Sequence, residues 1–84
     1  MVEIKFLVTT DKFEKDVKKI KNGSIKTRLK KQIKKISENP NVGKPLKHEL
    51  KEERTIYIKP FRLIYTVQED KLILLKFEHR NGVY

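Results

Sequence analysis

The sequence contains no cysteine and no tryptophan among its 84 residues, and it has only two histidines. The lack of cysteine excludes disulfide bonds, thiolate metal sites and cysteine nucleophiles. No apolar run approaches the roughly 18–20 residues that cross a membrane, and the first residues lack the long apolar stretch of a signal peptide. We therefore expect one cytoplasmic domain, residues 1–84, that uses no metal and no other cofactor.

Glycine is also scarce, and its distribution excludes further classes of enzyme. The three glycines are isolated from one another, so the chain has no glycine-rich phosphate loop. No serine lies in the setting of a hydrolase nucleophile. The acids of residues 47–54 alternate with basic residues, which is typical of a solvated segment. The sequence therefore gives no support to a carboxylate pair or a hydrolase triad.

Positive charge is what the chain has in excess. Lys and Arg number 21 and Asp and Glu 11, which gives a formal net charge of +10. The segment from Lys12 to Lys35 holds eleven basic residues and only the acids Glu14 and Asp16. Such a surface attracts polyanions, although a solvated lysine face would have the same composition. Charge alone does not separate RNA, DNA, the ribosome or an acidic protein as the partner.

The N-terminal half predicts one strand followed by two helices. Residues 2–8 are rich in Ile, Phe and Val, as strands are. Thr10 or Asp11 is a candidate N-cap for the first helix, and Asn22-Gly23 is its expected end. Ser24 is the expected N-cap of the second, and the short connection predicts a helical hairpin. The apolar positions at helical spacing are Phe13, Val17 and Ile20, then Ile25, Leu29, Ile33 and Ile36.

The C-terminal half predicts a loop followed by three strands. Residues 38–46 contain two prolines and a glycine, which indicates a loop. Apolar residues then dominate 56–58, 61–67 and 72–77. The segment 61–67 is apolar on both faces except at Arg62 and Thr66, which predicts a central strand. The fold class is α+β, with a β-α-α-β-β-β order and an antiparallel-rich curved sheet backed by the helical hairpin.

Arg62 is the residue that the strand pattern does not explain. A charge within an apolar strand is unusual, because an unpaired buried guanidinium is costly. It either forms an ion pair with Glu69, Glu78 or another carboxylate, or it is held on the sheet to bind a phosphate.

Metal-free cleavage of RNA requires few groups. One group must take the proton of a 2′-hydroxyl, another must neutralise the phosphate oxygens, and a third must assist the departing 5′-oxygen. The basic composition favours a cationic acid–base site over a carboxylate one.

Three segments together resemble a known family. They are residues 39–46 (Asn-Pro-Asn-Val-Gly-Lys-Pro-Leu), residues 61–67 (Phe-Arg-Leu-Ile-Tyr-Thr-Val), and the tail with His79-Arg80 and Tyr84. The set resembles the RelE/ParE superfamily of toxins from toxin–antitoxin systems, and within it the RelE-like branch. The resemblance covers essentially the whole chain and includes the predicted order of elements.

The resemblance implies a ribosome-dependent, metal-independent endoribonuclease that cleaves messenger RNA in the A site, leaves a 2′,3′-cyclic phosphate and arrests translation. It also implies a cognate antitoxin that covers the basic face, with oligomers formed only through that complex. By position, Arg62 would bind the scissile phosphate, Arg80 would stabilise the transition state or leaving group, and Tyr84 would position or deprotonate the nucleophile. The secondary candidates are Lys47, Arg54, Lys59 and His79.

Two alternatives stay open. A ParE-like inhibitor of DNA gyrase would bind a protein and perform no chemistry. A weak or silent relative would retain only ribosome or antitoxin binding, because Thr55 and Asn81-Gly82 stand where the family usually has basic residues.

Overall fold

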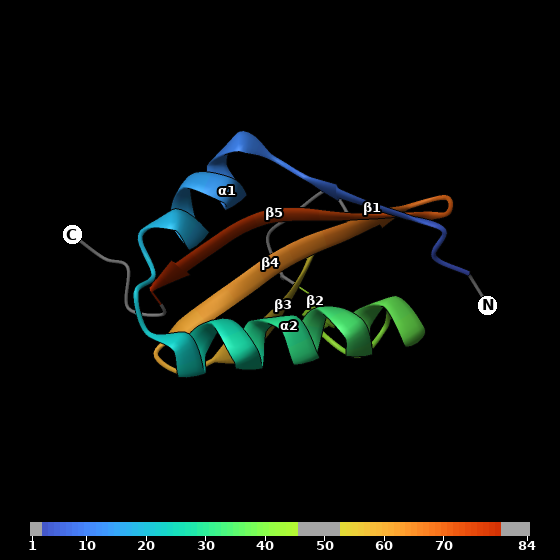
Figure 1. Cartoon of the computed structure of the whole chain (residues 1–84). Helices are drawn as coiled ribbons and strands as arrows, with labels where there is room; N and C mark the ends of the chain where they lie inside the picture. Colours follow the sequence, from blue (N-terminus) through green and yellow to red (C-terminus); the bar gives the residue numbers. More distant parts are fainter. Residues whose placement is uncertain (1–2, 46–52, 80–84) are drawn as a thin grey trace.

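The computed structural model describes residues 3–45 and 53–79. Two helices and five strands follow one another along the chain (Figure 1): β1 (Phe6–Thr9), α1 (Asp11–Lys18), α2 (Gly23–Glu38), β2 (Lys44–Pro45), β3 (Glu53–Ile58), β4 (Phe61–Gln68) and β5 (Lys71–His79). The predicted α+β class is confirmed. The two-residue strand β2 is an addition, since it lies in the segment predicted to be a loop.

The strands form one mixed sheet in the order β1-β5-β4-β3-β2. β1 pairs with β5 in parallel, and the other neighbours are antiparallel. β4 has a neighbour on each side, as its apolar sequence predicts. β2 pairs only with Arg54 and Thr55, so the rest of β3 is not paired with β2.

Both helices begin at side-chain caps. The Thr10 hydroxyl accepts a hydrogen bond from the Phe13 N–H at 3.0 Å, as one of the two predicted caps would. Asn22, not Ser24, caps α2, because its Oδ1 accepts from the N–H groups of Ser24 and Ile25 at 2.8 and 3.3 Å. An asparagine can satisfy two of the free N–H groups at a helix start in this way. The first helix ends at Lys18, earlier than predicted.

The core lies between the helices and one face of the sheet, which we call the inner face. α1 packs mainly on β5 and α2 on β3, and both lie on the same side of the sheet (Figure 1). The predicted apolar stripes of the helices are largely buried here. From the sheet, the inner face contributes Ile58, Leu63, Tyr65, Leu72, Leu74 and Phe77.

A β-bulge in β5 decides which of its residues face the helices. Ile64 pairs with Lys76 and Tyr65 pairs with Leu74, so Leu75 is an extra residue without a partner on β4. The extra residue shifts the alternation of side chains by one position. Leu74 and Phe77 therefore both face the core although they are three positions apart, an odd spacing that would otherwise put them on opposite faces.

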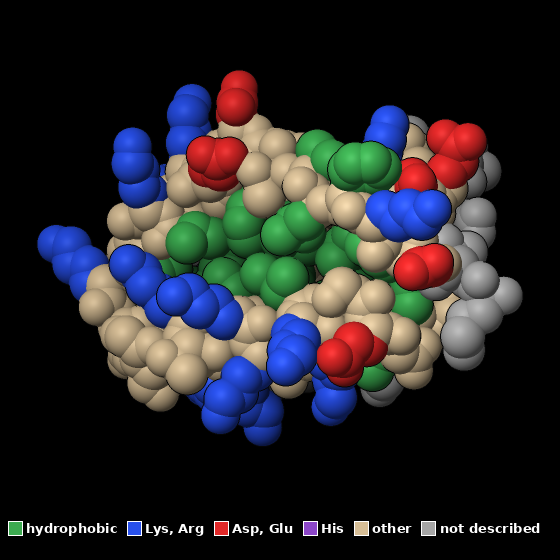
Figure 2. Space-filling model, turned by 45° about the vertical axis from the view of Figure 1, so that its right-hand side comes forward, with side chains coloured by type: hydrophobic (Ala, Val, Ile, Leu, Met, Phe, Trp, Pro, Cys, Tyr) green, Lys and Arg blue, Asp and Glu red, His purple; other side chains and the backbone are tan. Residues whose placement is uncertain are grey.

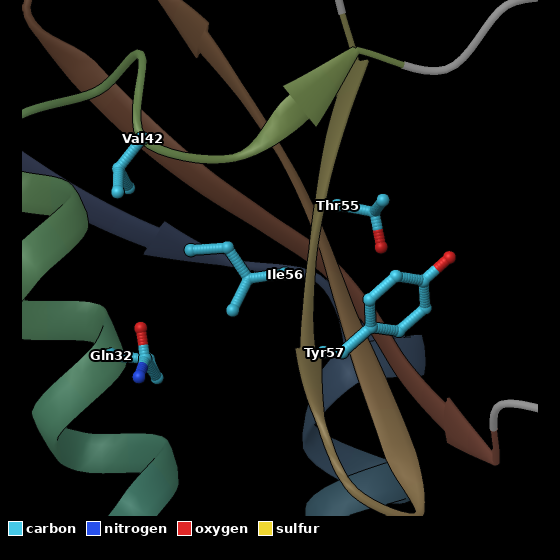
Figure 3. Close-up of a pocket in the computed structure, with 5 residues that line it drawn as sticks. All are labelled: Gln32, Val42, Thr55, Ile56 and Tyr57. Carbon is cyan, nitrogen blue, oxygen red and sulfur yellow. The ribbon is translucent and has the colours of Figure 1, made fainter.

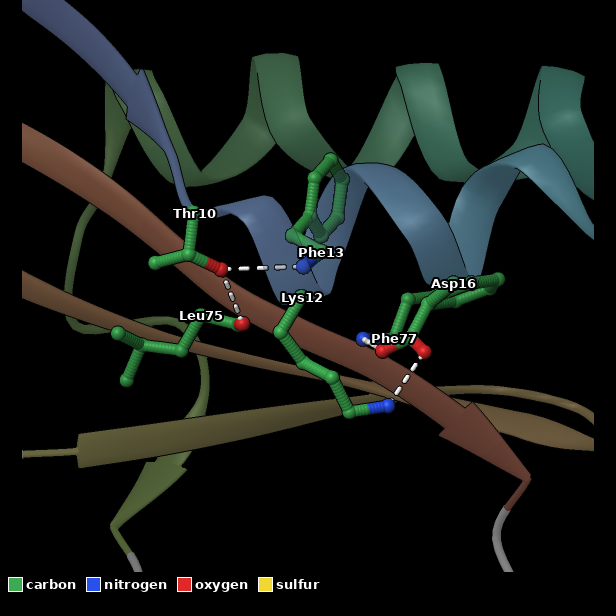
Figure 4. A network of polar contacts seen from close by, with 6 residues as sticks. All are labelled: Thr10, Lys12, Phe13, Asp16, Leu75 and Phe77. Carbon is green, nitrogen blue, oxygen red and sulfur yellow. Dashed lines mark hydrogen bonds and ion pairs between the residues drawn. The ribbon is translucent and has the colours of Figure 1, made fainter.

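Asp16 of α1 and Thr10, the N-cap of that helix, bind the backbone at this bulge through their side chains (Figure 4). The Thr10 hydroxyl donates to the Leu75 carbonyl at 2.6 Å, and Asp16 Oδ2 accepts from the Phe77 N–H at 3.0 Å. Asp16 is only 7% exposed, and its Oδ1 pairs with Lys12 Nζ at 2.5 Å. The buried carboxylate thus satisfies a backbone donor and is balanced by a lysine of its own helix.

Candidate active site

The candidate site lies on the outer face of the sheet, which is turned away from the helices. Tyr57 of β3 pairs with Arg62 of β4, and Arg62 pairs with Glu78 of β5. Because directly paired residues in a sheet point to the same side, the three side chains form one row, which we call the outer row. Their order across the sheet is phenol, guanidinium, carboxylate.

Arg62 forms an ion pair with Glu78. Its Nε and Nη2 both donate to Glu78 Oε2, at 2.9 and 2.6 Å. The two side chains are 33% and 26% exposed, so the pair is open to an incoming ligand while its geometry is held from two strands. This is the ion-pair alternative for Arg62, and it leaves the guanidinium at the surface where a phosphate can reach it.

The outer row is more accessible than the part of the next row that β3 and β4 contribute. Tyr57 is 43% exposed, whereas Thr55 and Ile64 in the next row are 5% and 2% exposed. Figure 3 shows Thr55 and Tyr57 on one side of β3, with Ile56 on the other side toward Val42 and Gln32. On β3 and β4, a ligand at the outer face therefore reaches the outer row more easily than the row beside it.

Arg54 lies on the inner face and supports the fold. Its Nη1 donates to the Gly43 carbonyl at 2.7 Å, and its register partner is the buried Tyr65. The structure therefore does not bring Arg54 together with Arg62. Alternation along β3 accounts for this, because Tyr57 and Arg54 are separated by an odd number of positions.

Lys59 is at the turn between β3 and β4. Its carbonyl accepts a hydrogen bond from Arg28 Nη2 of α2 at 2.8 Å, and its side chain is exposed. Arg28 thereby ties the turn next to Arg62 to a helix. This contact uses the backbone of Lys59 and leaves its ammonium group at the surface.

His79 does not share a face with Arg62. Its ring meets the edge of the Phe61 ring at a centroid distance of 5.5 Å, and Phe61 stacks on the core residue Phe77 at 5.0 Å. These contacts place the imidazole on the helix side of the sheet. The remaining predicted site residues, Lys47, Arg80 and Tyr84, lie outside the described residues.

Tyr65 is the buried tyrosine of the sequence motif, and its role in this structure is to bind a loop. Its hydroxyl donates to the Pro40 carbonyl at 2.8 Å and accepts from the Gly43 N–H at 3.0 Å. Burial raises the pKa of Tyr65, and the Gly43 hydrogen bond and the charge of Arg54 oppose part of that rise. A Cβ at Gly43 would lie 2.7 Å from the phenol oxygen, which explains the glycine there.

The sequence pattern indicates no functional role for Tyr57, and it marks Glu78 only as a possible ion-pair partner of Arg62. A usable signal was present for Tyr57, because a two-residue turn at Lys59-Pro60 would make it the register partner of Arg62. No comparable signal existed for Glu78, since its face depends on the bulge at Leu75.

A groove on the helix side is the second surface of interest. Figure 2 shows apolar side chains in a hollow between α1 and β1 on one side and α2 on the other, with basic and acidic side chains around it. On β1, Phe6, Leu7 and Val8 are all at least 39% exposed. The helix residues that line the hollow are Asp11, Phe13, Glu14, Lys15, Val17, Lys18 and Lys26.

No three His, Asp or Glu side chains within 3–45 and 53–79 are grouped as a metal site would require. In the same residues, no helix has the length and hydropathy needed to cross a membrane.

Comparison with known proteins agrees with the resemblance seen in the sequence. The profile of the family described as ParE toxin of the type II toxin–antitoxin system, parDE, matches residues 7–84. A curated protein of Methanocaldococcus jannaschii that bears the toxin name RelE4 is 32% identical over 87 residues, which cover 100% of this chain and 92% of that protein.

Solved structures show the same fold. The Escherichia coli RelBE toxin–antitoxin complex contains a chain that matches with a TM-score of 0.77 and 20% identity, over 88% of this chain and 94% of that one. The RelB–RelE complex of Methanococcus jannaschii contains another, with a TM-score of 0.75 and 24% identity, over 92% and 94%.

Proposed function

The chain belongs to the ParE toxin family of type II toxin–antitoxin systems, within the RelE/ParE superfamily, and we propose that it is an endoribonuclease that cleaves messenger RNA on the ribosome without a metal. The observation that carries the proposal is Arg62, a guanidinium fixed in a central strand and accessible on the outer face. The net charge of +10 supports binding to an RNA-rich surface.

The proposed reaction is a transfer within the RNA strand. The 2′-hydroxyl attacks the neighbouring phosphorus, the bond to the 5′-oxygen breaks, and a 2′,3′-cyclic phosphate and a 5′-hydroxyl end result. Arg62 stabilises the charge that builds up on the phosphate oxygens, which is the kind of contribution that fixed cations make best. Arg80 keeps its proposed role in stabilising the leaving group, and Tyr84 its proposed role in positioning the nucleophile.

The test is cleavage of a defined message on purified ribosomes, mapped by primer extension, with the wild-type protein and Arg62→Ala. We expect cuts at discrete positions, cyclic phosphate ends, and full activity when 1,10-phenanthroline removes transition metals while the Mg²⁺ that keeps the ribosome intact is retained. The rate should be about 10²–10³-fold lower for Arg62→Ala. Lys30→Ala, which removes an exposed cation of α2, is the matched control. Intact messages with the wild-type protein would refute the proposal.

Inhibition of DNA gyrase is the second candidate, favoured by the family whose profile matches the chain. It requires no chemistry at Arg62. Supercoiling by gyrase, measured with increasing protein, separates the two: inhibition at stoichiometric protein, together with uncut messages, would establish the second candidate.

We also propose that a cognate antitoxin occupies the groove between α1, β1 and α2. Both solved relatives above are complexes with an antitoxin. The lining joins the apolar Phe13 and Val17 to three lysines and two acids, and this apolar, net positive surface is complementary to an amphipathic helix with acidic residues beside its apolar side. The other possible mode is addition of a strand to the free edge of β1.

Charge reversal tests the groove. Lys18→Glu with Lys26→Glu should weaken the complex with the antitoxin at least tenfold. Lys30→Glu with Lys34→Glu makes the same charge change on exposed positions of α2 that do not line the groove, and it should have a much smaller effect. Equal losses in both double variants would show a general charge effect and no defined site.

A further inference from the structure

Glu78 and Tyr57 stand on either side of Arg62 in the outer row. We propose that this row is an acid–base site, in which Glu78 takes the proton of the ribose 2′-hydroxyl and Tyr57 gives a proton to the departing 5′-oxygen. The proposal rests on the ribonuclease function above and assigns its proton transfers to these two residues.

The contact between Glu78 and Arg62 leaves one carboxylate oxygen able to accept a proton. Both guanidinium donors converge on Oε2, and within the described part of the chain Oε1 has no hydrogen-bond partner. An ionised carboxylate has about four sites for accepting hydrogen bonds. Arg62 can therefore hold Glu78 in one orientation through Oε2 while Oε1 accepts a proton.

The order of the row suits an in-line displacement. Neighbouring strands are about 4.8 Å apart, so Glu78 and Tyr57 start one strand away from Arg62 on opposite sides. In an in-line reaction the attacking and leaving oxygens also lie on opposite sides of phosphorus. An RNA whose scissile phosphate is bound at Arg62 would thus place the attacking 2′-hydroxyl toward β5 and the departing 5′-oxygen toward β3.

The step balances with these groups and water. The 2′-O–H bond breaks, its proton passes to Glu78 Oε1, and the oxygen electron pair forms the new bond to phosphorus. The P–O5′ bond breaks, its electron pair stays on O5′, and that oxygen receives the phenol proton of Tyr57. Water then returns a proton to Tyr57 and removes the one on Glu78, so the enzyme ends in its starting state.

The experiment compares two substrates that differ only in the leaving atom. Messages carry either the normal 5′-oxygen or a bridging 5′-sulfur at the cleaved position, and single-turnover rates are measured on ribosomes. We expect Glu78→Gln to slow both substrates by about 10²–10⁴-fold. We expect Tyr57→Phe to slow the oxygen substrate by at least about 10²-fold and to leave the sulfur substrate near the wild-type rate, because a thiolate departs without a proton.

Glu53→Gln is the matched control. Glu53 is on the same face, in the row that contains Thr66 and Ile73, two rows away from Arg62, and the variant should cleave as the wild type does. Melting temperatures and binding of an uncleavable 2′-deoxy message check that each variant is folded. Should Glu78→Gln fail that check, Glu78→Asp replaces it and is expected to retain cleavage at a reduced rate.

Three results would overturn the proposal. Glu78→Gln could cleave as fast as Glu53→Gln, Tyr57→Phe could be equally slow on the sulfur substrate, or Glu78→Asp could match the wild type in rate. A wild-type protein that cuts neither substrate would instead refute the ribonuclease function itself, so the two failures are distinguishable.

Discussion

The phenol of Tyr65 connects the segment before β2 to the centre of the sheet, and its removal tests whether this contact holds that segment in place. Tyr65 has no exposed surface. Its hydroxyl is the partner of the Pro40 carbonyl and of the Gly43 N–H. Tyr65→Phe keeps the ring in the core and leaves one buried donor and one buried acceptor without their partner.

The expected loss follows from these two groups. Each buried polar group left without a hydrogen bond costs about 1–3 kcal/mol, so for two groups the free energy of unfolding should fall by about 2–6 kcal/mol. For a domain of this size, 1 kcal/mol shifts the melting temperature by about 4–8 °C. We therefore expect Tyr65→Phe to melt at least about 10 °C below the wild type.

Thermal and urea unfolding followed by circular dichroism measure the effect. Ser37→Ala is the control, because it removes a hydroxyl that donates to a backbone carbonyl at the same 2.8 Å but at an exposed site on α2. Water replaces that bond, so the control should stay within about 0.5 kcal/mol of the wild type. A melting temperature for Tyr65→Phe as close to the wild type as that of Ser37→Ala would refute the reasoning.

Three further predictions concern stability. Burial raises the pKa of Tyr65 in the folded protein, so the unfolded chain releases the phenol proton first, at about pH 10, and the folded protein only at higher pH. Above about pH 10 the free energy of unfolding of the wild type should therefore fall by up to about 1.4 kcal/mol per pH unit more than that of Tyr65→Phe. Urea unfolding between about pH 9 and 11 would measure this difference. Asp16→Ala leaves the Phe77 N–H unpaired and should cost about 1–3 kcal/mol in the same assay, while an unchanged midpoint would contradict the role of that carboxylate at the bulge. Thr55→Val removes a buried hydroxyl that has no hydrogen-bond partner among the described residues, so it should raise stability by about 1 kcal/mol, and a lower midpoint would show that the hydroxyl is satisfied.

The elements with strong periodicity could be predicted from the sequence. The helical stripe of α2 and the doubly apolar segment of β4 are properties of neighbouring residues, and the structure buries them as expected. Arg62 could be found for the same reason, since a charge inside an apolar strand contradicts its local pattern. Its partner could be narrowed to a few carboxylates but not chosen, because the choice depends on strand pairing.

The contacts that could not be predicted join residues far apart in the chain. The sequence predicts Arg54 as a secondary site residue because it is basic and close to Arg62 in the chain. In the structure its guanidinium binds the Gly43 carbonyl on the inner face. The face on which it lies follows from the register with β4, and a shift of one residue would reverse it. The strand β2 was missed for a similar reason, since two residues that include a proline carry no strand pattern of their own.

The position of Glu78 depends on α1, and this dependence links the fold to the proposed chemistry. Simple alternation from the buried Leu72 would turn Glu78 toward the helices and Phe77 away from them. The extra residue Leu75 reverses both, and α1 binds the backbone on either side of the reversal through Thr10 and Asp16. A helix on the inner face thus sets which acid stands beside Arg62 on the outer face. Thr10 also caps α1, and Asp16 also pairs with Lys12 of the same helix. The local sequence indicates only these two roles, so it does not predict that the same residues bind the bulge.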